Sequence, residues 1–248
     1  SDMNNILCMN WGDKYDDSYV EKLKEQCEEN CSVPFKFWCF TDRPDKDWHI
    51  PIPKTLDKFY DKERDFFWAY RKCYMFRYGQ MPGDIRWFPD NSKLLFLDLD
   101  VIIHQDLKYF FELPNDKPWI VRGWWNDILT VKKNYAKYKS TPLNSSAILW
   151  KKGEMMPVWE HVNKHAELIF FTYPSLDNYF THHWYDPWNE DDGFLRGFPQ
   201  GDIYSWYKGN VFPDDMEAKK LRKECKVCLF NNSSEINDVE ELKSLWSI

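Results

Sequence analysis

The chain has 248 residues, a hydrophobic fraction of 43% and a formal net charge of -7 at pH 7. This length and hydrophobicity suffice for one well-packed domain, and the acidic balance excludes non-specific nucleic-acid binding, which needs a basic surface. Aromatic residues make up 19% of the chain, so we expect some of them to line a surface that stacks on sugar or base rings.

The first third of the chain alternates strands and helices. Four elements are predicted in order: strand 5–10, helix 18–27, strand 35–40 and helix 64–78. Ser18 and Glu21 match a capping box at the start of the first helix. The alternation predicts parallel strands joined by right-handed crossovers, and therefore an α/β fold with a mostly parallel central sheet flanked by helices.

Residues 93–103 form an apolar run that only two carboxylates interrupt. Apolar residues on both parities predict one central strand covered on both faces. Asp98 and Asp100 would share a face, roughly 7 Å apart, because side chains alternate along a strand. Two such charges at a buried strand end raise each other's pKa unless a cation lies between them. Oxygen ligands favour Mg2+ or Mn2+, so the pair is a candidate divalent-metal site.

The second half has less regular patterning. The predicted elements are a helical turn 106–111, strands 119–122 and 147–150, helices 155–171 and 176–184, an extended segment 202–207, a strand 226–230 and a helix 238–246. Residues 123–139 have no clean periodicity and contain several lysines. We expect them to form a mobile, basic segment near the site.

The cysteines and the lengths of the apolar runs indicate the cellular compartment in which we expect the protein. Seven cysteines is an odd number, and they are scattered through apolar segments. No charged and then apolar leader opens the sequence, so we expect reduced thiols and a cytoplasmic protein. No apolar run approaches the ~20 residues that span a bilayer. The spacings of Cys27 to Cys31 and Cys225 to Cys228 resemble those of zinc ligands, but their apolar context favours buried thiols.

The acidic pair has two other interpretations. Two carboxylates at a strand end can simply cap the turn that follows. Asp98, Asp100 and Val101 after four apolar residues also satisfy the signature of haloacid-dehalogenase-type phosphatases. In those enzymes the motif normally opens the fold on the first strand, whereas here two predicted strands and two helices precede it.

Six segments occur in an order that resembles GT-A-fold glycosyltransferases, in particular family-8-like and related bacterial or viral sequences. They are residues 8–15, 37–42, 96–101, 143–147, 176–178 and 201–208. The resemblance implies a single GT-A-like domain, with a nucleotide-binding half over 1–105 and an acceptor and donor-sugar half over 106–248. It implies metal-dependent transfer of a hexose-like sugar from a UDP- or GDP-sugar to a glycan or other hydroxyl acceptor, with retention of anomeric configuration.

The resemblance also implies roles for residues of the nucleotide-binding half. By position, Asp98 and Asp100 match the acidic pair that binds the metal, the diphosphate and the ribose. The loop that begins at Asn10 matches the one that cradles the nucleotide base, with Trp11 or Tyr15 available for stacking.

Further roles fall in the second half. Asn144 and Ser145 match an Asn-Ser step that contacts the donor sugar. Asp177 and Asn178 fall where the family has an Asp-Gln pair near the reacting anomeric carbon, so Asn178 replaces a glutamine. An inverting role for Asp177 as a base is an open alternative.

The largest departure from the family pattern lies near the carboxyl terminus. Where the family has His-x-Gly followed by Lys-Pro, this chain has Asn-Asn-Ser-Ser-Glu from residue 231. An amide oxygen can ligate a hard cation, so Asn231 is the candidate third metal ligand. Lys208, or the pair Lys132 and Lys133, could replace the positive charge of the missing lysine. The missing residues also favour an alternative function, a non-catalytic nucleotide-sugar or glycan-binding module.

Aromatic residues of the second half are candidates for acceptor binding. Trp184 and Trp188 could form a platform, and we expect the aromatic face from Trp124 to Trp188 to hold the acceptor. His182 and His183 are adjacent on a predicted helix. Their side chains diverge by about 100°, so they are not a chelating pair.

Overall fold

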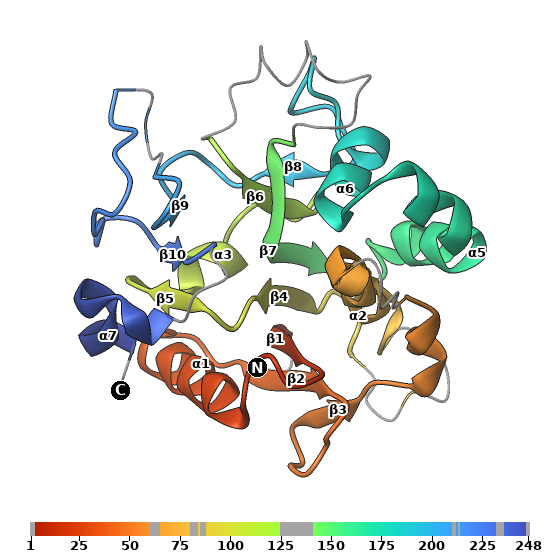
Figure 1. The fold of residues 1–248 in the computed structure, drawn as a ribbon, viewed down its shortest axis with the longest axis horizontal. Coiled ribbons are helices and arrows are strands. Elements are labelled where there is room, and N and C mark those ends of the chain that lie inside the picture. The colour runs from red at the N-terminus through yellow and green to blue at the C-terminus, as the bar shows by residue number, and fades with distance from the viewer. Residues whose placement is uncertain are drawn as a thin grey trace.

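The computed structural model describes residues 3–59, 65–79, 84, 88–124, 141–209, 212, 214–231 and 236–246. Its main sheet has seven strands in the order β3-β2-β1-β4-β7-β6-β8 (Figure 1). The bounds are β1 Asn4–Asn10, β2 Lys36–Thr41, β3 His49–Pro51, β4 Lys93–Leu97, β6 Trp119–Arg122, β7 Leu143–Lys151 and β8 Arg196–Gly197. Strands β1 to β4 are mutually parallel where they pair, and β7 is antiparallel to β4 and β6. The predicted α/β fold with a mostly parallel sheet is confirmed.

A second sheet has the order β5-β10-β9, with β5 Val101–Ile103, β9 Ile203–Ser205 and β10 Val227–Leu229. The prediction of one strand over 93–103 is therefore wrong. β4 ends at Leu97, and Asp98 to Asp100 link the two sheets. The Asp98 amide still donates to the carbonyl of Ser146 in β7, but the Asp100 carbonyl accepts from the amide of Phe230 after β10. The chain changes hydrogen-bonding partner between the two carboxylates.

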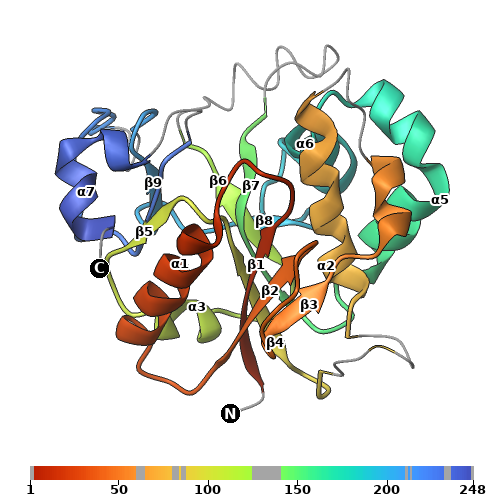
Figure 2. The ribbon, with the colours of Figure 1, turned by 60° about the horizontal axis from the view of Figure 1, so that its bottom comes forward.

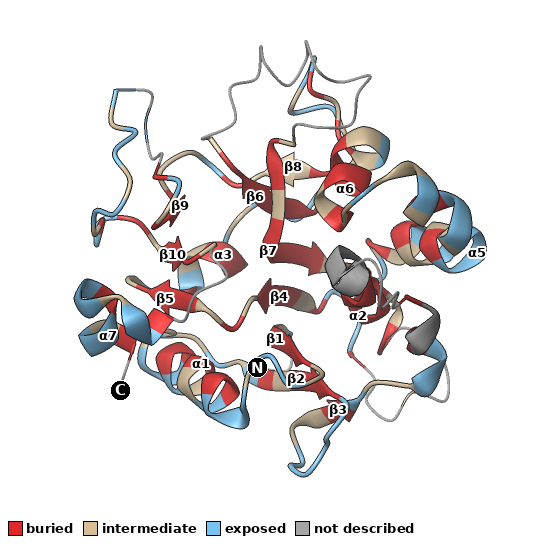
Figure 3. Cartoon of the chain, viewed as in Figure 1, coloured by how far each residue is buried: buried red, intermediate tan, exposed pale blue. Residues whose placement is uncertain are grey.

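Helices cover both faces of the main sheet (Figures 1 and 2). One face holds α1 Asp17–Glu29 and α3 Lys108–Phe111. The helix α7 Glu240–Trp246, with the short 3-10 helix Ile236–Asp238 before it, packs beside α1, where Trp246 contacts Tyr19 (Figure 2). The other face holds α2 Tyr74–Arg77, α5 Met156–Thr172, α6 Leu176–Trp184 and the 3-10 helices Lys54–Phe59 and Asp65–Cys73. Figure 3 shows the resulting pattern of buried strands and helices exposed on their outer sides. No helix within the described ranges is long and apolar enough to cross a bilayer.

Two helix predictions need correction. Asp16, rather than Ser18, caps α1, because its side chain accepts a hydrogen bond from the Ser18 amide at 2.9 Å. The helix predicted over 64–78 is a 3-10 helix up to Cys73 and only then the α-helix α2. Buried residues at spacings of three and four fit both helix types, so the sequence pattern could not separate them.

Candidate functional site

The carboxyl ends of β1 and β4 bring the first loop and the acidic pair together. The two strands are parallel neighbours, so the loop after Asn10 and the link after Leu97 emerge at the same edge of the sheet (Figure 2). Tyr15 in this loop donates its hydroxyl to Asp100 Oδ2 at 3.4 Å. Tyr15 and Asp100 are 85 residues apart in the sequence, and the structure brings them into contact. The sequence analysis had assigned both to the same site.

Lys72, which the sequence analysis did not single out, lies at the centre of the site. Its ammonium is 2.9 Å from Asp98 Oδ1 and donates to the carbonyl and hydroxyl of Ser145 at 3.1 and 3.2 Å. The Lys72 side chain is only 9% exposed. A buried ammonium needs paired charge and hydrogen bonds, and this one has both.

Asp177 completes a connected group of polar side chains. Its Oδ1 accepts the Ser145 backbone amide at 2.9 Å, so Ser145 on β7 stands between Asp177 of α6 and Lys72. The predicted donor-sugar residues Ser145 and Asp177 are therefore in contact, and both lie beside the ammonium that pairs with Asp98.

Burial raises the pKa of two carboxyls in this group. Burial, and then the charge of Asp98, raise the pKa of Asp100 well above the ordinary range of aspartate. Burial raises the pKa of Asp177 to about 6, against the opposing effects of Lys72 and of the hydrogen bonds from Ser145. Raised carboxylate pKa values indicate a place where an additional cation would be stabilised.

Asn231, the predicted third metal ligand, lies near the acidic pair through its bond with Ser146 and through its neighbour Phe230. It follows β10 in a left-handed conformation with φ of 52°, and the preceding residue, Phe230, donates its amide to the Asp100 carbonyl at 3.3 Å. Its Oδ1 accepts from the Ser146 hydroxyl at 3.4 Å, while its buried Nδ2 has no hydrogen-bond partner among the described residues. In the reverse amide orientation Nδ2 would donate to Ser146, and the oxygen would take the unpartnered position, where it can bind a cation.

These residues fit Mg2+ or Mn2+ better than they fit Zn2+. Two carboxylates and one amide oxygen are hard ligands of the kind that Mg2+ and Mn2+ prefer. All seven cysteines are free thiols, six of them buried. In the described ranges no group of three or more His, Cys, Asp or Glu side chains is arranged to hold a metal. A cysteine-based zinc site therefore has no support, and a Mg2+ or Mn2+ site with three protein ligands would need Asn231.

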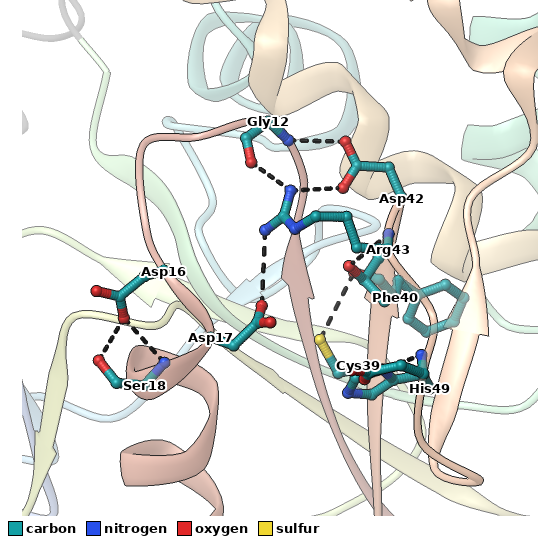
Figure 4. Close-up of polar contacts among 11 residues, drawn as sticks. Gly12, Asp16, Asp17, Ser18, Cys39, Phe40, Asp42, Arg43 and His49 are labelled. Atoms are coloured by element: carbon teal, nitrogen blue, oxygen red, sulfur yellow. Dashed lines mark hydrogen bonds and ion pairs between the residues drawn. The ribbon is translucent and has the colours of Figure 1, made fainter.

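A clamp of polar contacts holds the first loop (Figure 4). Asp42, just after β2, accepts the Gly12 amide at 2.9 Å and an Arg43 guanidinium N–H at 2.9 Å. Arg43 also donates to the Gly12 carbonyl and lies 3.6 Å from Asp17 at the start of α1. Gly12 has φ of 70°, which suits a glycine. The clamp fixes the backbone of the loop that the resemblance assigns to the nucleotide base.

Asn10 and Trp11 lie at the start of this loop. Asn10 is buried, and its Nδ2 has no hydrogen-bond partner in the part of the chain that is described. The Arg71 guanidinium lies 5.6 Å from the ring centroid of the half-buried Trp11. A donor without a partner beside a fixed indole suits a planar ring with carbonyl groups.

Within the described ranges, the other predicted site residues bond to partners other than Lys72 and Asp98. Asn178 is buried and bonds to Ser175 at the start of α6, and the Asn144 side chain accepts the Ser146 amide at 3.0 Å. Lys208 is exposed in the turn after β9. Lys132 and Lys133 lie outside the described residues, as does most of the segment 123–139.

The predicted aromatic face is divided between core and surface. Trp184 is half-buried against a core cluster, with its ring centroid 5.0 Å from that of Phe194, whereas Trp188 is 59% exposed. The Arg122 guanidinium lies 4.6 Å from the Trp124 ring centroid and pairs with Glu190 at 2.9 Å. This ion pair ties the end of β6, with Trp124, to the loop that bears Trp188.

Because Asp177 titrates at a raised pKa, its ionisation should cost stability. The folded protein holds the proton more tightly than the unfolded chain does, so this cost is absent below about pH 4 and complete above the folded-state pKa of about 6. Asp177→Asn is therefore expected to raise the free energy of unfolding at pH 8 by on the order of 1–2 kcal/mol. Thermal melts at pH 8 and pH 4 measure it, with the exposed Asp90→Asn as control. A stabilisation of equal size at both pH values would contradict the assignment.

Comparison with known proteins identifies the fold. No protein-family model and no curated protein sequence matches the chain. The structure is similar to that of the galactosyltransferase LgtC in complex with donor and acceptor sugar analogues, with TM-score 0.63 and 10% identity, over 98% of this chain and 95% of that one. It is also similar to a glycosyltransferase involved in glycosylation of the major capsid of PBCV-1, with TM-score 0.51 and 15% identity over 99% of both chains.

A third similar structure is mouse xyloside xylosyltransferase 1 in its apo form, with TM-score 0.52 and 12% identity, over 92% of this chain and 98% of that one. The three proteins are glycosyltransferases, and identities this low establish a shared fold alone. The chain therefore has the GT-A fold, as the sequence resemblance predicted, and the phosphatase alternative loses its structural basis.

Proposed function

We propose that this protein is a metal-dependent glycosyltransferase that moves a sugar from a nucleoside-diphosphate sugar to an acceptor hydroxyl. The observation that supports it most is the group formed by Asp98, Asp100, Lys72, Ser145 and Asp177 at the carboxyl edge of the sheet. Ligands of open α/β sheets bind at this edge. The group combines carboxylates for a cation with a buried ammonium that can face a phosphate.

A bound Mn2+ or Mg2+ would supply Lewis-acid stabilisation of the leaving diphosphate. Asp98, Asp100 and Asn231 are the residues that would hold it. Lys72 adds a fixed positive charge next to Asp98. This charge would take the place of the lysine that the family pattern has, and this chain lacks, after Asn231. Such charges, held in place before the reaction, stabilise the negative charge that develops on a leaving group.

Orientation of the donor falls to the remaining residues. The clamped first loop offers Trp11, Tyr15 and the unpartnered Asn10 amide for the base, UDP or GDP being the candidates. Asn144, Ser145, Asp177 and Asn178 are assigned to the donor sugar, and Lys208 to the phosphates. The Trp124 and Trp188 side chains are assigned to a glycan or other hydroxyl acceptor.

The test is incubation with a panel of nucleotide sugars, with Mn2+ and with a chelator. Release of nucleoside diphosphate only with metal supports the transferase. Binding without release supports the binding-module alternative. We also propose that the transfer retains anomeric configuration. NMR of the product anomer tests it, since inversion would instead assign Asp177 as the base.

Asn231→His tests the third ligand. Imidazole suits transition metals, so the variant should bind Mn2+ more tightly in the absence of nucleotide, by roughly tenfold, with much less change for Mg2+. Calorimetric titration of both metals into the wild type and the variant measures the difference. Unchanged Mn2+ affinity would mean that Asn231 does not face the metal.

A further inference from the structure

A separate cavity lies at the opposite end of the sheet. It has a volume of about 590 Å³ and is lined by Lys24 and Glu28 of α1, by residues 33–38 and by residues 47–48. β2 begins in this cavity at Lys36 and ends at Thr41, beside the first loop. A strand rises about 3.3 Å per residue, so roughly 17 Å of strand separates the cavity from the carboxyl edge. Figure 2 shows α1 and β2 meeting at the end of the sheet away from the loop after β1.

An aromatic platform forms part of the lining. Trp48 is half-buried, and its ring meets Phe37 at 5.6 Å and an angle of 67°, and His49 at 4.3 Å and 84°. Phe35 is also half-buried, packs against the same core cluster and lines the cavity. Because two rings pack against Trp48 at steep angles, the orientation of its indole is fixed, and the half-buried ring lines the cavity. A pyranose ring has a face of C–H groups that stacks on such an indole.

The charges of the lining balance. Lys24 and Lys36 are opposed by Glu28 and Asp47, so the lining has no net charge. Lys24 pairs with Glu28 one helical turn away, and its ammonium lies 5.6 Å from the Trp48 ring centroid. Carboxylates accept from hydroxyl groups and ammonium groups donate to them, so a neutral polyol can use both signs. A phosphorylated or acidic ligand would need a basic excess, which this cavity lacks.

We propose that this cavity, the α1–β2 cavity, is a second binding site that takes a neutral oligosaccharide, with Trp48 as the stacking platform and the Lys24–Glu28 pair bonding to sugar hydroxyls. Its volume lies within the roughly 300–1,000 Å³ of ligand sites. The inference rests on the lining of the cavity and not on the transfer reaction. Its role would be to tether the protein to a glycan away from the transfer site.

The test is calorimetric titration of the full chain, without donor or metal, with maltotetraose, cellotetraose, chitotetraose and tetragalacturonate. At least one neutral tetrasaccharide should bind with a Kd on the order of millimolar, and more tightly than the acidic one. Trp48→Ala should weaken this binding at least tenfold. Glu28→Gln, at an exposed helix position, should weaken it by about threefold without endangering the fold.

Three results would overturn the proposal: no binding of any neutral tetrasaccharide, preference for tetragalacturonate, or binding that Trp48→Ala and Glu28→Gln leave unchanged. Loss of binding in Trp188→Ala alone would assign the sugar to the acceptor region instead. The same titration on Asp98→Asn should match the wild type. The titration therefore remains valid even if the protein transfers no sugar, because it needs neither donor nor metal.

Discussion

Replacing Asp98 or Asp100 with asparagine is expected to weaken metal-dependent binding of a nucleoside diphosphate by roughly 100-fold or more and to abolish sugar transfer. Each substitution removes a carboxylate charge from the proposed cation site. Calorimetry with UDP and GDP, each with and without Mn2+, measures the loss. Metal-independent binding through the first loop should change much less, because the clamp of Gly12, Asp42 and Arg43 does not include either carboxylate.

The two variants should differ in stability, which separates loss of binding from loss of fold. Asp100→Asn removes a charge whose burial is unfavourable, so it should fold at least as well as the wild type at pH 8. Asp98→Asn breaks the 2.9 Å ion pair with Lys72 and should be less stable. The exposed Asp90→Asn serves as control. Unchanged nucleotide affinity in both folded variants would contradict the metal-site assignment.

The acidic pair was predictable because its signal is local. Asp98 and Asp100 stand out against the apolar residues around them, whereas Asn10, Ser145 and Asp177 were assigned through the resemblance to GT-A-fold glycosyltransferases, and their roles are proposals. The break between β4 and β5 gave no such signal. Residues on both sides of the break are buried, so the apolar pattern continues through it although the hydrogen-bonding partner changes from β7 to β10.

Lys72 was missed for a related reason. It lies in a helical segment in which Tyr70 and Cys73 are buried, and a lysine there has the pattern of an ordinary surface residue. The available hint was Arg71 and Lys72 together, two consecutive cations in an otherwise apolar segment. Only the packing of this segment against β7 reveals that the ammonium reaches Ser145, 73 residues further along the chain.

Lys72→Met is expected to have the other large effect. Methionine keeps most of the aliphatic length but removes the ammonium, so Asp98 loses its ion pair and the Ser145 oxygens lose their donor. We expect a loss of about 3 kcal/mol in the free energy of unfolding. The value of kcat/KM for transfer should fall by roughly 100- to 1,000-fold. Lys72→Arg, which keeps the charge, should retain more of both quantities.

A double-mutant cycle separates the two roles of Lys72. If its structural role is to neutralise Asp98, the variant with both Lys72→Met and Asp98→Asn should be more stable than Lys72→Met alone, because no charge is left unpaired. Its activity should stay at the level of Asp98→Asn, since neither the cation ligand nor the ammonium is restored. Chemical denaturation gives the stabilities and diphosphate release gives the rates. Additive stabilities would show that the pair is not coupled, and wild-type turnover by Lys72→Met would remove Lys72 from the proposed site.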